Sequence, residues 1–462
     1  MRWEPADPAL RDAALAVCRL VRDAGGRALL VGGCVRDAVL EHPPTDLDLE
    51  VYGVPPDRLE SLLEQRFRVD RVGRAFGVLK IRGLALDVSL PRREFKIGEG
   101  HRGFHVQADP DLTPAEASLR RDFTINAMAL DPLTGELIDP HGGRRDLERR
   151  VLRHVSEKFA EDPLRVLRGM QLVARFDLTA DPATVALCRT LGMEGLARER
   201  IEQEWRKLVL QGARISAGLA FLRDTTWLRF FPELAALVDC PQDPAWHPEG
   251  DVWTHTLHCM DAFAAERTGD AWEDWVVGLA VLCHDMGKPL VLRREGERIT
   301  TPGHDRAGVE PARRFLQRLT RQRDLFEQVL PLVAAHMAPR QLYEGNAGDA
   351  AVRRLARRVG RIDRLVRVAR ADFRGRGPSP DAPFPAGDWL LARARRLAVL
   401  DARPRPLVMG RHLLDIGLEP GPHLGAILDA CYEAQLDGRI TTLEEGLALA
   451  RELARRPADD GA

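Results

Sequence analysis

The chain has 462 residues, of which 45% are hydrophobic, and its 68 Lys and Arg nearly balance its 69 Asp and Glu. This length exceeds that of one ordinary domain, and the hydrophobic content excludes a disordered protein. A net charge near zero excludes a uniformly basic protein that coats nucleic acid, although it permits local basic surfaces.

The cysteines and the apolar segments point to a soluble protein of the cytoplasm. Seven Cys are scattered without a C-x-x-C pair, which favours reduced thiols over a disulfide framework or a zinc ribbon. The first ten residues lack the pattern of a signal peptide, and no apolar run approaches the roughly 18 residues of a membrane span. The sequence therefore predicts a cytoplasmic protein with no membrane partner.

The chain to about Asp139 predicts a mixed α and β region. Alternating polar and apolar residues indicate strands, and apolar residues three and four apart indicate helices. The predicted elements are a helix at 9–24, a strand at 27–31, a helix at 34–40, and strands at 45–53, 77–81 and 84–90.

Helical periodicity dominates the rest of the chain. A Pro-rich stretch at 232–248 predicts a linker, 378–385 predicts a loop, and the tail from Gly387 is helical. The predicted helices span 145–151, 163–176, 182–191, 201–210, 254–266, 272–282, 311–321 and 325–336.

The first candidate site combines a glycine turn with carboxylates on strands. Gly32 and Gly33 lie between a strand and a helix, where the backbone can approach a phosphate, and Arg36 follows in the first turn. Asp46 and Asp48 alternate on the next predicted strand and therefore point to one side, which suits Mg²⁺. Asp87 adds a third carboxylate if its strand is a neighbour.

Each part alone has an ordinary structural explanation. A pair of glycines is usually a turn, and a D-x-D pair is usually a solvated strand face. The order of strand, glycines, helix and D-x-D strand is more specific, and it matches neither a Walker A loop nor a G-x-G-x-x-G motif.

This order resembles the signature of class II tRNA nucleotidyltransferases and bacterial poly(A) polymerases, which share a polymerase-β-like palm. Four further motifs extend the resemblance in the expected order to about Leu210. They are Arg120–Met128 (RRDFTINAM), Leu137–Gly143 (LIDPHGG), Glu161–Arg165 (EDPLR) followed by Arg168, and Glu199–Ile201 followed by Glu204.

The resemblance implies roles for individual residues. The triphosphate would lie against the glycine turn and Arg36, Mg²⁺ would bind Asp46 and Asp48, and Asp87 would complete the catalytic carboxylates. The remaining nucleotide contacts would come from Arg121, from Asp122 near the ribose, and from Asp162, Arg165 and Arg168 at the base edge.

The base-reading residues also make chemical sense. Cytosine and adenine each present a donor amine beside a ring acceptor, so one carboxylate and one guanidinium can pair with either base. Two structural alternatives stay open: Asp162 can cap the helix that follows Pro163, and Arg168 can form a structural salt bridge.

The second candidate site is a histidine–aspartate cluster. His255, the adjacent His284 and Asp285, and the distant Asp372 follow the H…HD…D order, which resembles HD-domain phosphohydrolases. Imidazole and carboxylate ligands suit a divalent metal that activates water. His304 and His336 are expected to be ordinary surface histidines.

A nucleotidyltransferase followed by an HD domain resembles the multifunctional CCA type of this family. The resemblance implies an α+β fold: a polymerase-β-like palm (1–145), an all-α neck and body (146–235), an all-α HD domain (245–376) and a helical tail (387–462). It also implies addition of CCA to tRNA from CTP and ATP with Mg²⁺. The HD domain would use Ni²⁺, Mg²⁺ or Mn²⁺ as a 2′,3′-cyclic phosphodiesterase, 2′-nucleotidase and phosphatase for repair of tRNA ends.

Several alternatives remain open. The head could be CC-only, A-only or a poly(A) polymerase, although the long polar segment at 92–119 matches the family's flexible loop, which is needed to switch from CTP to ATP. An RNA-binding HD phosphohydrolase with an inactive head is opposed by the intact Asp46 and Asp48. The protein would be a monomer or a homodimer.

One segment is locally basic despite the balanced total. Residues 351–376 hold ten Arg against Asp363 and Asp372. Such a run is usually a solvated helix face. Because it leads into Asp372, it also predicts an RNA-phosphate surface beside the hydrolase site.

Overall fold

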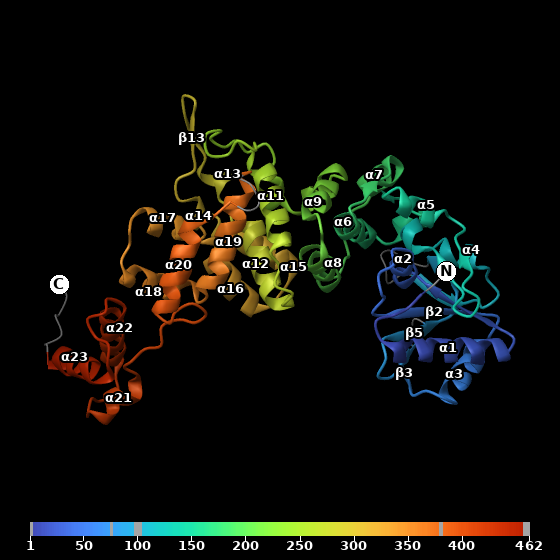
Figure 1. Cartoon of the computed structure of the whole chain (residues 1–462), viewed down its shortest axis with the longest axis horizontal. Coiled ribbons are helices and arrows are strands. Elements are labelled where there is room, and N and C mark those ends of the chain that lie inside the picture. The colour runs from blue at the N-terminus through green and yellow to red at the C-terminus, as the bar shows by residue number, and fades with distance from the viewer. Residues whose placement is uncertain (1–2, 74–76, 97–103, 378–381, 456–462) are drawn as a thin grey trace. The chain divides into compact units, whose positions relative to one another are not determined.

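The computed structural model describes residues 3–73, 77–96, 104–377 and 382–455, and the chain divides into two compact units between Phe230 and Phe231 (Figure 1). The predicted α+β class is confirmed, because the main sheet lies in the first unit and helices make up nearly all of the second. In the described part of the chain, every helix is too short or too polar to cross a membrane. All seven Cys are free and buried.

A seven-stranded sheet organises the first unit in the order β3-β4-β5-β2-β1-β8-β9. All its pairings are antiparallel except that of β2 with β5, which is parallel. Because β2 lies beside β5 at the centre of the sheet, Asp48 of β2 comes to lie next to Asp87 of β5. The strands are β1 Arg27–Val31, β2 Leu47–Tyr52, β3 Val69–Gly73, β4 Val78–Ile81, β5 Leu86–Ser89, β8 Ala129–Leu130 and β9 Leu137–Ile138.

Helices α1 and α3 pack against this sheet and each other (Figure 1). The first begins where Asp7 accepts a hydrogen bond from the Ala9 amide and Pro8 occupies the first helical position, a favoured helix start. The helices of this unit are α1 Pro8–Asp23, α2 Gly33–Val39, α3 Pro56–Glu64, α4 Pro114–Ser118, α5 Gly143–Glu148, α6 Leu164–Phe176, α7 Pro182–Arg189, α8 Arg198–Gln211 and α9 Ile215–Asp224. Short pieces complete it: the 3₁₀ helices η2 Thr124–Asn126, η3 Glu157–Glu161 and η4 Trp227–Phe230, and the parallel pair β10 Val151–Leu152 and β11 Thr179–Ala180.

The second unit is built around α12, which is buried on nearly every side because its residues from Asp274 to Cys283 are all buried. Helices α11 and α19 pack against it and against each other. The elements before the tail are α10 Pro232–Ala235, α11 Val252–Ala265, α12 Ala271–Cys283, α13 Lys288–Val291, the hairpin β12 Arg293–Glu295 and β13 Arg298–Thr300, α14 His304–Ala307, α15 Val309–Leu319, α16 Arg323–Val333, α17 Ala338–Glu344, α18 Asp349–Val359, α19 Ile362–Gly375 and α20 Pro385–Arg396.

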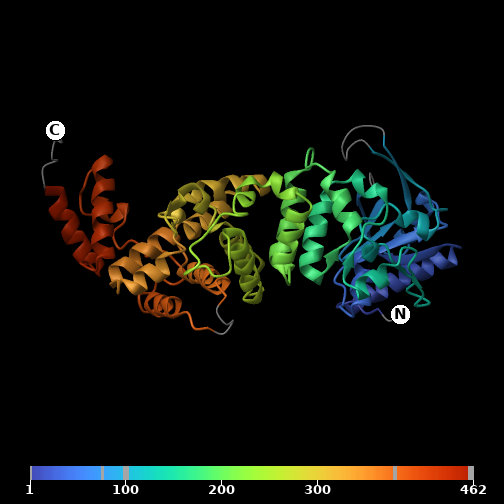
Figure 2. The ribbon, with the colours of Figure 1, turned by 90° about the horizontal axis from the view of Figure 1, so that it is seen from above.

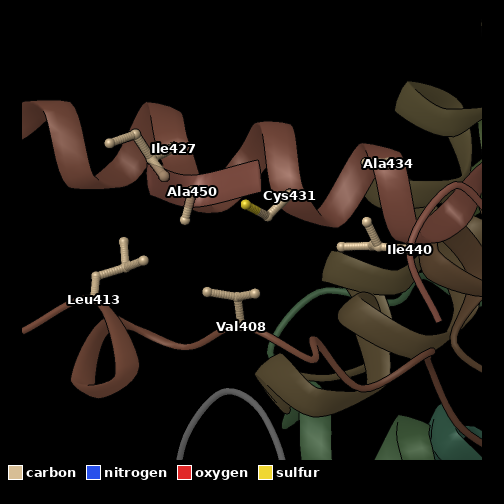
Figure 3. Packing of buried hydrophobic residues seen from close by; sticks show 7 residues of the cluster. All are labelled: Val408, Leu413, Ile427, Cys431, Ala434, Ile440 and Ala450. Carbon is tan, nitrogen blue, oxygen red and sulfur yellow. The ribbon is translucent and has the colours of Figure 1, made fainter. Parts of the chain in front are cut away.

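The tail has a small core of its own. Helices α22 Pro422–Leu436 and α23 Leu443–Arg455 lie side by side, and α21 Gly410–Asp415 packs against both (Figures 1 and 2). Figure 3 shows the buried cluster between them, made of Val408, Leu413, Ile427, Cys431, Ala434, Ile440 and Ala450.

The structure corrects one sequence expectation and adds detail to another. Within 92–119, the strands β6 Arg92–Lys96 and β7 Phe104–Ala108 form an antiparallel hairpin and α4 follows, while residues 97–103 lie outside the described residues. The match of this segment to the family's flexible loop stays a prediction. The stretch 232–248 is not a simple linker, because α10 and the fully buried Phe231, Leu234 and Leu237 belong to the core of the second unit. There the proline starts a helix instead of breaking one.

Candidate active sites

A pocket of about 260 Å³ in the first unit gathers most of the predicted nucleotide-site residues. It draws them from the glycine turn, from β2, from the Arg120–Asn126 motif and from the start of α6. Its lining comprises Gly32, Gly33, Arg36, Asp48, Arg120, Arg121, Asp122, Asn126, Asp162, Arg165 and Arg168.

Of the three predicted catalytic carboxylates, Asp48 lines this pocket and Asp87 is its neighbour on the next strand. Asp48 stands directly opposite Asp87 in the parallel register of β2 and β5, so the predicted neighbour relation of these strands is confirmed. Lys80, on β4, donates to Asp87 at 2.9 Å. Although Asp48 is exposed at the pocket, partial desolvation and the negative charges of Asp46 and Asp87 outweigh the attraction of Arg121 and raise the pKa of Asp48 to about 6. Crowded acidic side chains of this kind fit a divalent cation, which would replace the proton on Asp48.

The turn before α2 needs glycine for a physical reason. Gly32 has φ +80°, and a Cβ there would lie 3.2 Å from a guanidinium nitrogen of Arg121. Arg36 is buried, donates to Asn126 Oδ1 at 2.7 Å and to Asp37, and stacks on Phe176 at 4.4 Å. Its guanidinium is thus held in place at the pocket wall.

The Arg–Arg–Asp motif is fixed by buried carboxylates. Arg120 donates to Glu50 at 2.8 Å, and Tyr52 donates to the same carboxylate at 2.6 Å. Burial alone would raise the pKa of Glu50, but Arg121 and Arg120 outweigh it and hold the pKa below its ordinary value. Glu50 was missed at the sequence level, although its place two residues after Asp48 on the same strand was a usable signal.

The buried Asp122 pairs with Arg168, whose side chain is partly exposed. Arg168 donates through Nε to Asp122 at 2.7 Å, while Asn126 and the Phe123 amide donate to the other carboxylate oxygen. The salt-bridge alternative for Arg168 is therefore correct, and both side chains also line the pocket.

Asp162 and Arg165 are held at the start of α6. Asp162 accepts from the Leu164 amide at 3.2 Å, so the capping alternative is correct, and Arg200 of α8 donates to its other oxygen at 2.7 Å. Arg165 donates to the backbone carbonyls of Lys158 and Arg120. Both side chains are positioned by neighbours and face the pocket.

The second unit brings the histidine–aspartate cluster together. His255 lies on α11, His284 ends α12, Asp285 follows it, and Asp372 lies on α19. The Nε2 atom of His255 is 3.1 Å from Asp372 Oδ1 and 3.7 Å from Asp285 Oδ2, and that of His284 is 3.2 Å from Asp285 Oδ2. All four side chains are buried. Close packing of α11 on α19 requires Gly375, because a Cβ there would meet Cys259 Sγ at 2.3 Å.

Hydrogen bonds at the Nδ1 atoms orient His255 and His284. His284 Nδ1 lies 2.6 Å from the Val281 carbonyl, which can only accept, so this ring donates through Nδ1 and turns Nε2 inward. His255 Nδ1 donates to Glu249 Oε1 at 2.7 Å, while its Nε2 faces Asp372 Oδ1. Burial alone would lower the pKa of His255, but its contacts with Cys259, Asp372 and Glu249 hold the pKa well above its ordinary value. Within the described residues, the buried Nε2 of His284 has no hydrogen-bond partner. An orphaned imidazole lone pair beside two carboxylates fits a metal ion.

Glu249 is a site residue that the sequence did not reveal. It accepts from His255 and from His247, at 2.7 and 2.9 Å. Burial would raise the pKa of Glu249, but these hydrogen bonds lower it to about 2. Asp372 is supported similarly by Arg376, whose guanidinium lies 2.9 and 3.0 Å from the two carboxylate oxygens.

The expectation that His304 and His336 are ordinary surface histidines is wrong. His336 is buried, and its Nε2 lies 3.2 Å from that of His304 and 3.9 Å from Asp285 Oδ1. Burial and the neighbouring His284 lower the pKa of His336 to about 4. No local sequence pattern connects either histidine with the HD motif, and only the fold brings them close to it.

Two adjoining cavities open onto this cluster. One of about 220 Å³ is lined by His247, Asp285, Lys288 and His304, among others, and its neighbour of about 490 Å³ is largely apolar. Both reach Asp372 and Arg376. The aromatic residues of the larger cavity are Trp246, Tyr343, Phe373 and Phe384.

The predicted RNA-phosphate surface at 351–376 is not supported. Eight of its ten arginines form ion pairs with carboxylates of the same unit, namely Arg354, Arg357, Arg361, Arg364, Arg367, Arg370, Arg374 and Arg376. Arg353 donates to the Leu436 carbonyl. Most of the partners lie outside the segment, as Glu433 does for Arg357, so a local charge count overstates the unpaired positive charge.

Comparison with known proteins places the chain in a family. Residues 28–153 match the model of the poly A polymerase head domain. The multifunctional CCA protein of Xanthomonas euvesicatoria is 39% identical over 415 residues, covering 86% of this chain and 95% of that protein. The protein of the same name from Stenotrophomonas maltophilia is 40% identical over 378 residues, covering 78% and 89%.

The chain belongs to the multifunctional CCA protein family. Solved structures agree on the fold. The Bacillus stearothermophilus CCA-adding enzyme in complex with CTP has a TM-score of 0.64 at 22% identity, covering 96% of this chain and 98% of that one. The Thermotoga maritima CCA-adding enzyme complexed with tRNA has a TM-score of 0.58 at 18% identity, with 98% and 96% covered.

Proposed function

We propose that this member of the multifunctional CCA protein family adds C, C and A to the 3′ end of tRNA from CTP and ATP. The observation that carries the proposal is the single pocket that joins the carboxylate edge at Asp48 to Asp162 and Arg165. Its relatives by name are multifunctional CCA proteins, and structures of the same fold are complexes with CTP, ATP and tRNA.

The reaction would be nucleotidyl transfer. The 3′ hydroxyl of tRNA attacks the α-phosphorus of the nucleotide, the new phosphodiester forms, and pyrophosphate leaves. Mg²⁺ held by Asp46 and Asp48, with Asp87 as the neighbouring third carboxylate, would supply charge neutralisation at the phosphates. Arg36 and Arg121 would bind the triphosphate beside the Gly32–Gly33 turn.

Base choice would come from the other end of the pocket. Asp162 would accept from the exocyclic amine of cytosine or adenine, and Arg165 would donate to the adjacent ring acceptor. Arg200 binds Asp162, and backbone carbonyls accept hydrogen bonds from Arg165. These contacts would hold the two side chains in position to pair with the base. Asp122 and Arg168 would line the ribose side.

The experiment gives a tRNA that ends before CCA labelled CTP and ATP, singly and together, with Mg²⁺. We expect two added residues with CTP alone and three with both nucleotides. Arrest at two residues with both nucleotides would indicate a CC-only enzyme, and long adenosine runs would indicate a poly(A) polymerase. Either result would overturn CCA addition as the function.

We propose, secondly, that the cluster of the second unit is an HD-domain phosphohydrolase that clears phosphates from tRNA ends. The observation that favours it is the orphaned Nε2 of His284 among His255, Asp285 and Asp372. A divalent metal there would supply an activated water. We assign residues 245–376 to this domain, 1–145 to the head, 146–235 to the neck and body, and 387–462 to the tail.

The large apolar cavity beside the cluster fits a nucleobase next to the phosphate that is hydrolysed. We expect Trp246→Ala to raise the KM for a 2′,3′-cyclic nucleotide by ten- to a hundredfold, because base stacking contributes about 1–3 kcal/mol. The KM for glycerol 2-phosphate, which has no base, should stay unchanged. Leu290→Ala, at another exposed apolar residue, is the matched control. Equal effects on both substrates would contradict a base subsite.

Removing the carboxylate behind His255 should weaken metal binding without removing a ligand. We expect Glu249→Ala to lower the affinity of the second unit for Mn²⁺ by about 10–100-fold, since partners of this kind orient metal-bound imidazoles. Titration calorimetry on the full chain measures it, with the exposed Glu297→Ala as the control. An unchanged affinity would show that Glu249 does not position His255.

A further inference from the structure

We propose that Cys259 is a further ligand of the metal in the second unit, so that the cluster binds its cation through a thiolate as well as through imidazoles and carboxylates. The inference rests on the proposed phosphohydrolase function, because the cation belongs to that site. The H…HD…D pattern contains no sulfur. A thiolate in the ligand set predicts a preference for a soft divalent transition metal over Mg²⁺.

Cys259 lies one helical turn after His255 on α11, so both side chains point to the same side of the helix. Its Sγ is 3.3 Å from Nε2 of His255, the atom that faces Asp372 Oδ1 at 3.1 Å. Both His255 and Cys259 are fully buried. A cation bound at that Nε2 therefore lies within reach of the sulfur.

Four side chains of the cluster form a compact ligand set. One ligand atom from each of His255, Cys259, His284 and Asp372 lies within 4.8 Å of all the others. His284 is only 1% exposed, and in the part of the chain that the structure describes its Nε2 has no hydrogen-bond partner. This unsatisfied nitrogen points to an ion in the middle of the set independently of the cysteine. Two imidazoles, a thiolate and a carboxylate together suit Zn²⁺, Co²⁺ or Ni²⁺.

The neighbouring cationic side chains give a reason for an additional anionic ligand. Lys288 Nζ lies 2.6 Å from Asp285 Oδ2, and the guanidinium of Arg376 lies 2.9 and 3.0 Å from the two oxygens of Asp372. Each carboxylate therefore already shares its negative charge with a side chain of the protein. On coordination the S–H bond of Cys259 breaks, the sulfur binds the ion and the proton passes to water, which adds one negative charge to the ligand set.

Packing accounts for a small side chain at this position but not for sulfur. A Cβ on Gly375 would lie 2.3 Å from Cys259 Sγ, so α11 and α19 meet closely here. Alanine or serine would also fit that space. The property that distinguishes cysteine from these two residues is a soft ligand atom, and it lies beside the Nε2 of His255.

Binding of Co²⁺ tests the assignment without using catalysis. The full chain carrying Asp48→Asn, which weakens the cation site of the head, is stripped with a chelator and titrated with Co²⁺. We expect an intense near-ultraviolet band from charge transfer between the thiolate and Co²⁺. Cys259→Ser and Cys259→Ala, each made in the same chain, should lose this band. Cys240→Ala, at another cysteine of the second unit, should keep it.

The affinities of the same chains separate a ligand from a packing role. Loss of a thiolate weakens the binding of a soft cation more than that of a hard one. We therefore expect either Cys259 variant to lower the affinity for Cd²⁺ by about tenfold or more and the affinity for Mn²⁺ by less than about twofold. Titration calorimetry measures both. Equal losses for the two cations would show that Cys259 only supports the packing of His255, and they would overturn its assignment as a ligand.

The outcomes distinguish a wrong ligand from a wrong function. Co²⁺ bound without the charge-transfer band, or with a band that both Cys259 variants keep, would overturn Cys259 as a ligand. If that chain still needed a divalent metal to hydrolyse a 2′,3′-cyclic nucleotide, the phosphohydrolase function would stand. No bound Co²⁺ and no hydrolysis would overturn both. The spectrum of the parent chain needs no substitution at Cys259, so absence of its band overturns the proposal even if both variants fail to fold.

Discussion

Replacing Asp48 with Asn should abolish tRNA extension while leaving phosphate hydrolysis intact. A metal ligand contributes several kcal/mol of charge stabilisation in phosphoryl transfer, so we expect the extension rate to fall by about 10³-fold. The rate of hydrolysis of a 2′,3′-cyclic nucleotide should stay within about twofold of the parent rate. A tenfold change in rate corresponds to about 1.4 kcal/mol, so a change of twofold is small enough to count as no effect. Single-turnover extension and steady-state hydrolysis on one preparation measure both.

The same substitution should not destabilise the fold. Partial desolvation and the charges of Asp46 and Asp87 raise the pKa of Asp48 to about 6, so its charged form is disfavoured and its loss relieves repulsion. We therefore expect an unchanged or slightly higher Tm. Asp57→Asn, at an exposed residue of α3, is the matched control and should change neither activity nor Tm. Retained extension by Asp48→Asn would show that this carboxylate is not a metal ligand.

Replacing His284 with Ala should have the converse effect. Its Nε2 has no hydrogen-bond partner in the described structure and lies beside Asp285, so its loss removes a ligand and no other contact of that atom. We expect hydrolysis to fall by about 10³-fold, by the same several kcal/mol of metal chemistry, with extension unchanged.

His423→Gln, at an exposed histidine of the tail, is the control for His284→Ala. A melting curve checks the fold, because the buried ring leaves a cavity that costs stability. If His284→Ala also abolished extension in a folded chain, the two activities would not belong to separate sites.

The sequence predicted best what local patterns determine. Strand β1 matches its predicted bounds, and α1, α2, α6, α11 and α12 match theirs within two residues or so, because periodicity, caps and breakers act over a few positions. The eight predicted nucleotide-binding residues all line one pocket. Their place in a motif was visible in the order of the chain, although their roles remain proposals.

Long-range partners were not predictable in the same way. Glu50 pairs with Arg120 across 70 positions, and Arg354 and Arg357 of α18 pair with Glu433 of the tail. His304 and His336 join the histidine–aspartate cluster only through the fold, which brings their Nε2 atoms within 3.4 and 3.9 Å of Asp285 Oδ1. Such contacts depend on tertiary packing, and no short stretch of the sequence reveals them.

The presence of two cooperating sites in one chain is tested most directly on a damaged tRNA. A tRNA that ends before CCA in a 2′,3′-cyclic phosphate is incubated with the full chain, labelled CTP and ATP, and divalent metal. We expect the intact chain to clear the phosphate and then add three residues, and His284→Ala to extend only a matched tRNA with a free 3′ hydroxyl. Failure of the intact chain to extend the cyclic-phosphate end, while it extends the free end, would contradict the repair function.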